Sequence, residues 1–451
     1  MLRQTALAAG VAASAWCGAD TQAQSVDALL NKLVDKKVIT AEEATQLKQE
    51  SDQGFAKAYQ GKTGMPDWVT SLKFNGDFRG RAEQFTSDNP AFTDRTRYRY
   101  RLRFGTTATI KDDFEVGFRL TSADNATGTA GGNPVSNNTT LQDNASKKGI
   151  FIDAAYAKWT PIHNANWTAS GTIGKFDNPF QVSNMVLDYD YVPEGLALQG
   201  AYKFNDHHSL KLNTALFILD EVNQPSIANP SAGHDPYLYG GQLLWEAKWT
   251  PKLESALSLS AFNIVNKQNL TEGLVPNTSD GNTRVLGNLV NNYNPIIGGA
   301  SLTYKLDSCP GYQGQFPLRV GGEFMRNSAA ASNNEGWWGG VTLGKAGKKG
   351  TWELAYKYER LQGDAWYEEL VDDDFGAFYA GVGPRTGAGG FRGGTNVKGH
   401  VIKGTYSFTD SLSFVVTYYQ TELIQQSAPL IPPAVSKSDS GHLLVDLMWK
   451  F

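Results

Sequence analysis

Polar and apolar side chains alternate with a period of two over much of the chain from residue 69 onward, and the clearest case is residues 95–110, RTRYRYRLRFGTTATI. A β-strand places alternate residues on opposite faces, whereas a helix would scatter both sets around its circumference. This stretch therefore predicts a strand with one basic face and one largely aromatic and apolar face. The basic face carries Arg95, Arg97, Arg99, Arg101 and Arg103, and the other carries Thr96, Tyr98, Tyr100, Leu102 and Phe104.

Similar alternation predicts fifteen further strands, sixteen in all, and their connections are alternately short and long. Short turns at one end and long loops at the other are typical of a closed transmembrane β-barrel, and a soluble sandwich has no reason to show them. We therefore predict an antiparallel barrel of about 16 strands. The strands are expected at about 69–86, 92–110, 114–125, 150–160, 167–175, 195–204, 209–218, 236–250, 255–265, 293–306, 316–326, 337–345, 351–360, 395–409, 411–421 and 439–451.

A barrel in a membrane also decides which way the arginines face. An arginine on the lipid side near the bilayer midplane costs about 2–4 kcal/mol. Several of the five would lie at that depth, so the wrong orientation would cost on the order of 10 kcal/mol, comparable with the whole stability of a domain. The arginines are expected to line a water-filled lumen. The predicted pore-lining basic residues are Arg79, Arg81, Arg95, Arg97, Arg99, Arg101, Arg103 and Arg119.

Composition restricts the function classes. The net charge of −4 does not suggest a nucleic-acid partner. Outside the N-terminal leader no run of 18 apolar residues occurs, so membrane-spanning helices are not expected. No catalytic motif and no metal-ligand spacing among the six histidines is visible, so we expect neither an enzyme nor a bound metal or cofactor.

The N-terminal region differs from the rest of the chain. Residues 1–23 are expected to form a signal peptide, and Trp16 makes Cys17 a poor lipidation site. Residues 24–66 are expected to form a periplasmic helical segment and linker, with a capping box at Thr40 to Glu43 that opens a second helix. This segment is either a helical hairpin that serves oligomerisation or a solvated leader to a barrel at residues 67–451.

The last strand ends in an aromatic residue. Residues 441–451, GHLLVDLMWKF, place Trp449 and Phe451 on the more apolar face. Such an ending is similar to the signal that the outer-membrane barrel-assembly machinery reads. The alternative is an ordinary edge strand that ends in Phe by chance.

Several consecutive segments resemble the putative porin family of Gram-negative bacteria. They are FEVGFRLTS, NPVSNNTTLQDNASKKGIFIDAAYAKWTP, GTIGKFDNPF and MVLDYDYVPEGLALQG, and the likeness covers about residues 70–205. The resemblance implies an outer-membrane channel for small solutes, placed among lipid and lipopolysaccharide, and a possible homotrimer. One departure concerns Leu187, since relatives commonly have Trp before the first Asp of this segment.

In general porins the third outer loop folds into the barrel and narrows it. Here the third outer connection is residues 176–194, and its acidic groups are expected to face the basic wall across the lumen. Opposed charges would create a transverse field that sorts solutes. The alternative is local pairing of the arginines with carboxylates on neighbouring strands. The expected acidic constriction residues are Asp177, Asp188, Asp190 and Glu194.

Other interpretations remain open. The arginine ladder suggests an anion- or phosphate-selective channel, because guanidinium groups match carboxylate and phosphate oxygens. A barrel that sheaths a partner, such as an electron conduit or a secretion pore, would share the barrel pattern. The acidic run Glu368, Glu369 and Asp372 to Asp374 on the loop 361–394 is either solvated or a binding site for divalent ions.

Overall fold

The computed structural model describes residues 30, 33–34, 36, 39–40, 43–49, 66–89, 93–125, 131–222, 234–270, 281–378, 391–427 and 437–451. The chain divides into two compact units, Met1–Ser71 and Leu72–Phe451. The predicted signal peptide, residues 1–23, lies outside the described residues, as does most of the segment 24–66. None of the described helices is long and apolar enough to cross a membrane.

In the first unit, a helix covers residues 43–49 and begins with the predicted capping box. The Glu43 N–H donates to Thr40 Oγ1 at 3.1 Å, and the Glu43 carboxylate accepts the Thr40 N–H at 2.8 Å. These two bonds satisfy backbone donors that a helix start leaves without intrahelical partners. Most of the rest of the predicted hairpin lies outside the described residues, so the hairpin stays a prediction.

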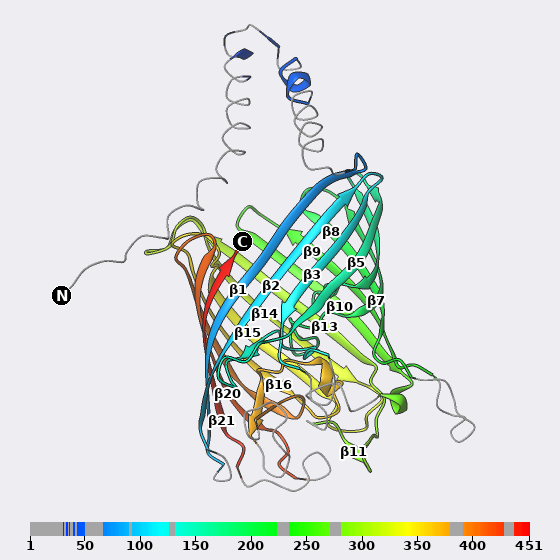
Figure 1. Cartoon of the computed structure of the whole chain (residues 1–451), viewed down its shortest axis with the longest axis vertical. Helices are drawn as coiled ribbons and strands as arrows, with labels where there is room; N and C mark the ends of the chain where they lie inside the picture. The colour runs from blue at the N-terminus through cyan, green and yellow to red at the C-terminus, as the bar shows by residue number, and fades with distance from the viewer. Residues whose placement is uncertain are drawn as a thin grey trace, which may run out of the picture. The chain divides into compact units, whose positions relative to one another are not determined.

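The second unit is a closed barrel of sixteen antiparallel strands, which confirms the predicted fold (Figure 1). Each strand pairs with its neighbours along the chain, and β21 pairs with β1 from Lys450 opposite Asp77 to Ser440 opposite Ser87. The barrel therefore has no free edge. Its strands are β1 (Val69–Ser87), β2 (Arg95–Ile110), β3 (Phe114–Ser122), β5 (Ile150–His163), β6 (Trp167–Lys175), β7 (Glu194–Lys203), β8 (His208–Ile218), β9 (Tyr237–Lys248), β10 (Leu253–Val265), β13 (Pro295–Leu306), β14 (Phe316–Asn327), β15 (Glu335–Gly344), β16 (Trp352–Leu361), β19 (Val397–Ser407), β20 (Leu412–Leu423) and β21 (Ser440–Lys450).

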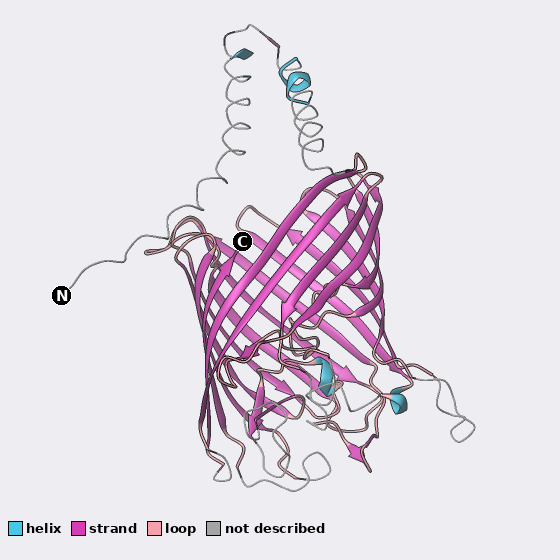
Figure 2. Cartoon of the chain, in the orientation of Figure 1, coloured by secondary structure: helices cyan, strands magenta, loops and turns pink. Residues whose placement is uncertain are grey.

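Short additional elements belong to the long connections. Figure 2 shows them, together with irregular loop segments, at the lower end of the barrel wall. One of them, β4, pairs with the barrel strand β2. The elements are β4 (Thr139–Thr140), η1 (Lys267–Asn269), β11 (Arg284–Val285), β12 (Asn288–Leu289), η2 (Glu368–Leu370), β17 (Gly376–Phe378) and β18 (Phe391–Gly393).

The two faces of each strand have opposite character. On β2, Tyr98 is 59% exposed and Leu102 is 43% exposed, whereas Arg99 and Arg101 are each only 5% exposed. An outer surface of aromatic and aliphatic side chains around buried charges is the reverse of a soluble protein and suits a barrel surrounded by lipid.

The apolar outer face and polar inner face of the wall give a testable prediction for two adjacent residues of β10. Leu259 is 57% exposed on the outer face, whereas Ser258 lines the lumen cavity. Leu259→Arg is expected to lower the free energy of unfolding by about 2–4 kcal/mol, because it places a cation in lipid. Ser258→Arg is the matched control and is expected to cost clearly less. Urea unfolding of the barrel refolded in lipid vesicles measures both, and equal costs would contradict the assigned faces.

The main apolar core lies inside the barrel, between the wall and the long connections. Phe217 of β8, Leu238 of β9, Phe262 of β10 and Met325 of β14 are each at most 3% exposed and belong to one cluster with connection residues. Burial of this apolar surface explains why the connections fold inward instead of extending into solvent.

Candidate functional site

Residues 176–193, the connection between β6 and β7, cross the lumen and contact strands from different sides of the barrel. The Gln181 N–H donates to Gln242 of β9 at 2.9 Å, and the Ser183 N–H donates to Glu323 of β14 at 3.1 Å. Farther along, Asp190 accepts from Arg101 of β2 at 3.1 Å. Contacts with β9, β14 and β2 place this connection, here called the first lumen loop, across the interior of the barrel.

Residues 362–378, in the connection between β16 and β19, form a second lumen loop. Their acidic side chains are not solvated: Glu368 is fully buried, and Glu369 and Asp372 are each 5% exposed. Glu368 pairs with Arg284 at 2.7 Å, and burial raises the pKa of Glu369 to about 8. The interpretation of this run as a solvated loop is therefore wrong for Glu368, Glu369 and Asp372.

The two lumen loops are joined by apolar contacts and backbone hydrogen bonds. Trp366 is fully buried, and its Nε1–H donates to the Val186 carbonyl at 2.7 Å. The Asp188 N–H donates to the Leu370 carbonyl at 2.8 Å, and the Asp372 N–H donates to the Asn184 carbonyl at 3.0 Å. We call this junction the seam.

A third inward segment covers part of the basic wall. In β4, Thr139 and Thr140 pair with Tyr100 and Arg99 of β2. Just before them, Asn138 accepts from Arg79 at 2.7 Å through its side chain and from Arg99 at 3.0 Å through its carbonyl. The middle of the arginine ladder is therefore covered on its lumen side.

The basic wall is extensively neutralised by local carboxylates. Asp77 of β1 accepts from Arg101 at 2.8 Å and from Arg103 at 2.7 Å. Asp190 of the first lumen loop reaches the same arginines at 3.1 and 3.9 Å, and Arg79 at 4.0 Å. Burial opposes ionisation of Asp190, but the guanidinium groups of Arg101, Arg79 and Arg103 outweigh burial and lower its pKa. Both expected arrangements, local pairing and an opposing acidic loop residue, occur here.

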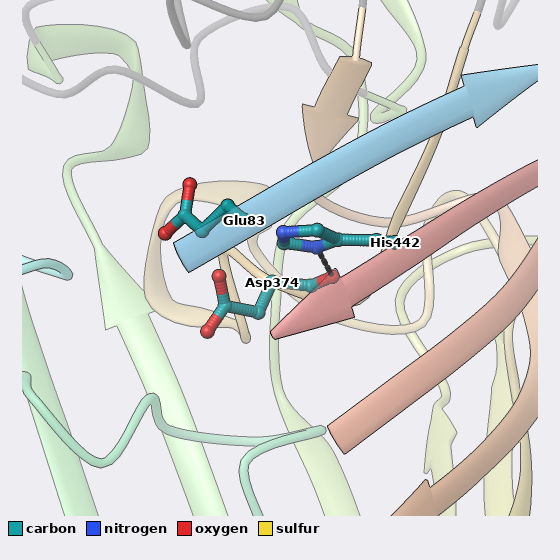
Figure 3. Close-up of side chains that lie close together, drawn as sticks. All are labelled: Glu83, Asp374 and His442. Carbon is teal, nitrogen blue, oxygen red and sulfur yellow. Dashed lines mark hydrogen bonds between the residues drawn. The ribbon is translucent and has the colours of Figure 1, made fainter. Parts of the chain in front are cut away.

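A second neutralised group lies where β1, β21 and the second lumen loop meet (Figure 3). Glu83 is 1% exposed and accepts from Arg97 and, at 3.4 Å, from Arg99. Arg81 pairs with Asp446 of β21 at 2.7 Å and with Asp374 at 3.2 Å.

His442 forms a further contact between this wall and the loop. Its Nδ1 lies 3.2 Å from the Asp374 carbonyl, and its ring stacks on Phe85 at 4.2 Å between centroids. Figure 3 shows the side chains of Glu83, Asp374 and His442 gathered between the two strands and the loop. The loop is thus attached to the wall through both a side chain and its backbone.

The remaining predicted residues lie elsewhere. Arg119 pairs with Asp177 at 2.6 Å, and Glu194 pairs with Lys175 at 3.3 Å at the start of β7. Arg95 is partly buried near the end of β2 that adjoins the long connections. At the chain end, Trp449 packs on Phe78 with ring centroids 5.9 Å apart, and the Phe451 N–H donates to the Gly76 carbonyl at 3.1 Å. Both terminal aromatics have exposed side chains.

Asp188 does not face the arginines, in contrast to Asp190. Its carboxylate lies at the seam with Asp372 and Asp373, and ligand oxygens of the three lie within 4.8 Å of one another. Burial and the neighbouring carboxylates raise the pKa of Asp188 and Asp373 well above the ordinary value, and burial together with Asp374 raises that of Asp372 to about 7. The structure therefore separates two acidic residues that the sequence places two positions apart.

A cavity of about 660 Å³ lies between the seam, the basic wall and the opposite strands. Its lining includes Arg79, Arg81 and Arg101 on one side. Tyr189 and the seam carboxylates line it as well, together with Arg319 of β14 and Lys403 of β19. The cavity is polar and mixed in charge, as expected for a water-filled space.

Two described groups have the residue types of a metal site: Glu83 with Asp374 and His442, and the three seam carboxylates. Glu83 already accepts from arginines, so the first group is poorly suited to a further cation. At the seam, the Lys357 ammonium interacts with Asp372 and donates to Asn184 at 2.8 Å. This ammonium reduces the attraction of the seam for a metal ion.

Sequence reasoning missed the second lumen loop and the roles of Arg319 and Lys403. The available signal was the alternation of acids with large apolar residues in 365–375, AWYEELVDDDF, because a solvated acidic loop does not need Trp366, Leu370 or Phe375. Alternation along β14 and β19 places Arg319 and Lys403 on the lumen face. Whether they also line the cavity depends on how far the inward loops extend along the wall.

Comparisons with known proteins agree with this architecture. Residues 88–286 match the family model described as putative porin. No curated protein sequence matches the chain. The high-pH structure of Pseudomonas putida OprB is similar at 12% identity and a TM-score of 0.50, with 87% of this chain and 96% of that chain covered. A Salmonella typhi OmpF structure in complex with daunomycin is similar at 13% identity and a TM-score of 0.44, with 84% and 97% covered. At such identities the likeness to OprB shows the fold alone.

Proposed function

Since the chain matches the putative porin family over residues 88–286, we propose that it forms a water-filled channel for passive diffusion of small hydrophilic solutes and ions. The observation that carries the proposal is the charged cavity of about 660 Å³ inside a closed barrel whose outer face is apolar. Charged and polar side chains around an interior space keep water there, and the apolar exterior lets lipid surround the wall.

The constriction lies where the first lumen loop approaches the basic wall. Asp190 and the wall arginines place opposite charges at the same level of the passage. The seam carboxylates lie beside another part of the cavity. A solute therefore passes fixed charges of both signs, which favours small polar molecules that orient in a local field.

The experiment is single-channel recording of the purified protein in planar lipid bilayers. We expect a steady open conductance in KCl, and a reversal potential in a salt gradient that reports ion preference. A folded barrel that never conducts would overturn the proposal. That outcome would favour a barrel that sheaths a partner protein, an alternative already made less suitable by lumen loops that occupy the interior.

An anion-selective channel is the second candidate, but its support is not the arginine ladder. Arg97, Arg99, Arg101 and Arg103 all have carboxylate partners, so their charges are largely compensated. Arg319 and Lys403 line the cavity without a hydrogen bond or ion pair among the described residues. They favour anions in the cavity more directly than the ladder does.

We place the channel in the bacterial outer membrane, delivered by the N-terminal signal and assembled through the C-terminal strand that ends in Trp449 and Phe451. A homotrimer is the assembly we expect. Mass measurement of the detergent-purified protein tests it, and a monomer as the sole species would contradict it.

A further inference from the structure

The charges that line the cavity fall into two groups. Six cationic and eight carboxylate side chains line it, which gives a formal charge of −2 when all are ionised. Half of them have an oppositely charged partner, as in the pairs Arg81 with Asp446, Arg101 with Asp190, and Lys357 with Glu359. The lining charges without an oppositely charged partner within 4.0 Å in the described part of the chain are Arg319, Lys403, Glu323, Glu353, Asp188, Asp372 and Asp373.

The three seam carboxylates differ from the other lining acids because they face each other. Their oxygens lie within 4.8 Å of one another, and Asp188 and Asp372 are at most 6% exposed. Close, buried carboxylates cannot all ionise without strong repulsion, so protons are retained to a higher pH than on isolated acids. The raised pKa of all three, about 7 for Asp372, is consistent with this geometry.

Charged or titratable groups on each element packed against the seam influence the ionisation of its three carboxylates. The first lumen loop contributes Asp190 and Tyr189, and the second contributes Asp374. Among the largest influences on the three carboxylates, the cations are Lys357 of β16, which acts on Asp372, and Arg99 of β2, which acts on Asp373. Further groups are Glu359 of β16, Glu323 of β14 and Tyr419 of β20.

We propose that the seam carboxylates Asp188, Asp372 and Asp373, acting against Arg319 and Lys403, make the cavity charge more negative and shift its ion preference toward cations as pH rises. This inference rests on the channel function proposed above. With Lys357 taken as neutralised by Glu359, which does not itself line the cavity, the formal charge of the lining is 0 when all three seam carboxylates are neutral and −3 when all three are ionised. The net charge of the first state favours neither kind of ion, whereas that of the second favours small cations.

The loops stay docked over this change. A carboxyl whose pKa is raised by folding stabilises the folded arrangement below its unfolded pKa, and this contribution is lost as pH rises through the folded value. For Asp372 that loss accumulates between the ordinary value of 3.8 and about 7, the value to which its pKa is raised, and is complete above it. Trp366 and Leu187, both at most 1% exposed, hold the seam together through contacts that do not titrate.

Reversal potentials of the full chain in planar bilayers, under a KCl gradient at about pH 5 and about pH 9.5, test the proposal. We expect the preference to move toward potassium from low to high pH, with a change in permeability ratio of roughly threefold or more. A conducting channel whose preference does not move toward potassium with pH would overturn the inference while leaving the channel function intact. A protein that never conducts would overturn both.

Two sets of variants identify the groups responsible. The triple change Asp188→Asn, Asp372→Asn and Asp373→Asn is expected to keep the low-pH preference at high pH. Arg319→Gln with Lys403→Gln alters only exposed wall positions and is expected to shift the preference toward potassium at both pH values. Asp307→Asn, at an exposed residue outside the cavity lining, is the control and is expected to retain the pH response. A triple variant with the full pH response, or a double variant with unchanged preference, would overturn the assignment.

Discussion

Glu83→Gln is expected to lower the free energy of unfolding of the barrel by about 3–5 kcal/mol, the range found when a buried ion pair loses one partner. Glu83 is 1% exposed and faces Arg97, Arg99 and Arg81, with the last two at 3.4 and 3.5 Å. A neutral amide leaves these guanidinium groups buried with much of their negative charge removed. Urea unfolding of the barrel refolded in lipid vesicles measures the cost.

The control is a glutamate of the same barrel in an exposed pair. Glu422 of β20 is 39% exposed at its side chain and pairs with Lys398 at 2.9 Å. Glu422→Gln is expected to change the free energy of unfolding by at most about 1 kcal/mol, because solvent screens such pairs. Equal effects of the two substitutions would show that the burial of Glu83 on the basic wall adds nothing to the free energy that its ion pairs contribute.

Trp366→Ala is expected to release the lumen loops and to raise the single-channel conductance. The Trp366 ring is fully buried, packs on Phe262 at 5.7 Å between centroids, and donates to the Val186 carbonyl. Its removal costs about 3–5 kcal/mol of the packing that holds the two loops together. Planar bilayer recording measures the change, and more frequent transitions between conductance levels are expected beside a larger mean value.

Trp337→Ala provides the matched control on the outer face. Trp337 of β15 is 39% exposed and contacts Tyr358 with ring centroids 5.4 Å apart. Its loss removes a similar ring from the lipid-facing surface, so stability changes but the passage does not. A conductance that is equal in the two variants would contradict the role given to the lumen loops.

The barrel wall could be predicted from the sequence because it depends on a local rule. Alternation gave sixteen strands, and the observed bounds differ by a few residues, as for β2, predicted from residue 92 and observed from Arg95. Every second side chain must suit either lipid or the lumen, so the pattern is repeated in each strand.

The interior could be predicted only in part, because it depends on contacts between distant segments. The position of the first lumen loop followed from the order of long connections. The different surroundings of Asp188 and Asp190 did not, because a turn directs one toward Asp372 and Asp373 and the other toward Arg101. Carboxylates are usually solvated on loops, so the burial of Glu368 contradicted a sound general expectation.

Solvent exposure along β2 tests the central claim most directly. Single cysteines at residues 98–104, introduced into a Cys309→Ser background, can be labelled in lipid vesicles with a water-soluble reagent and with a lipid-phase quencher. The account predicts a period of two, with lipid contact at Tyr98, Leu102 and Phe104 and with Arg99, Arg101 and Arg103 shielded from lipid. Lipid contact at the arginine positions, or the absence of any alternation, would contradict it.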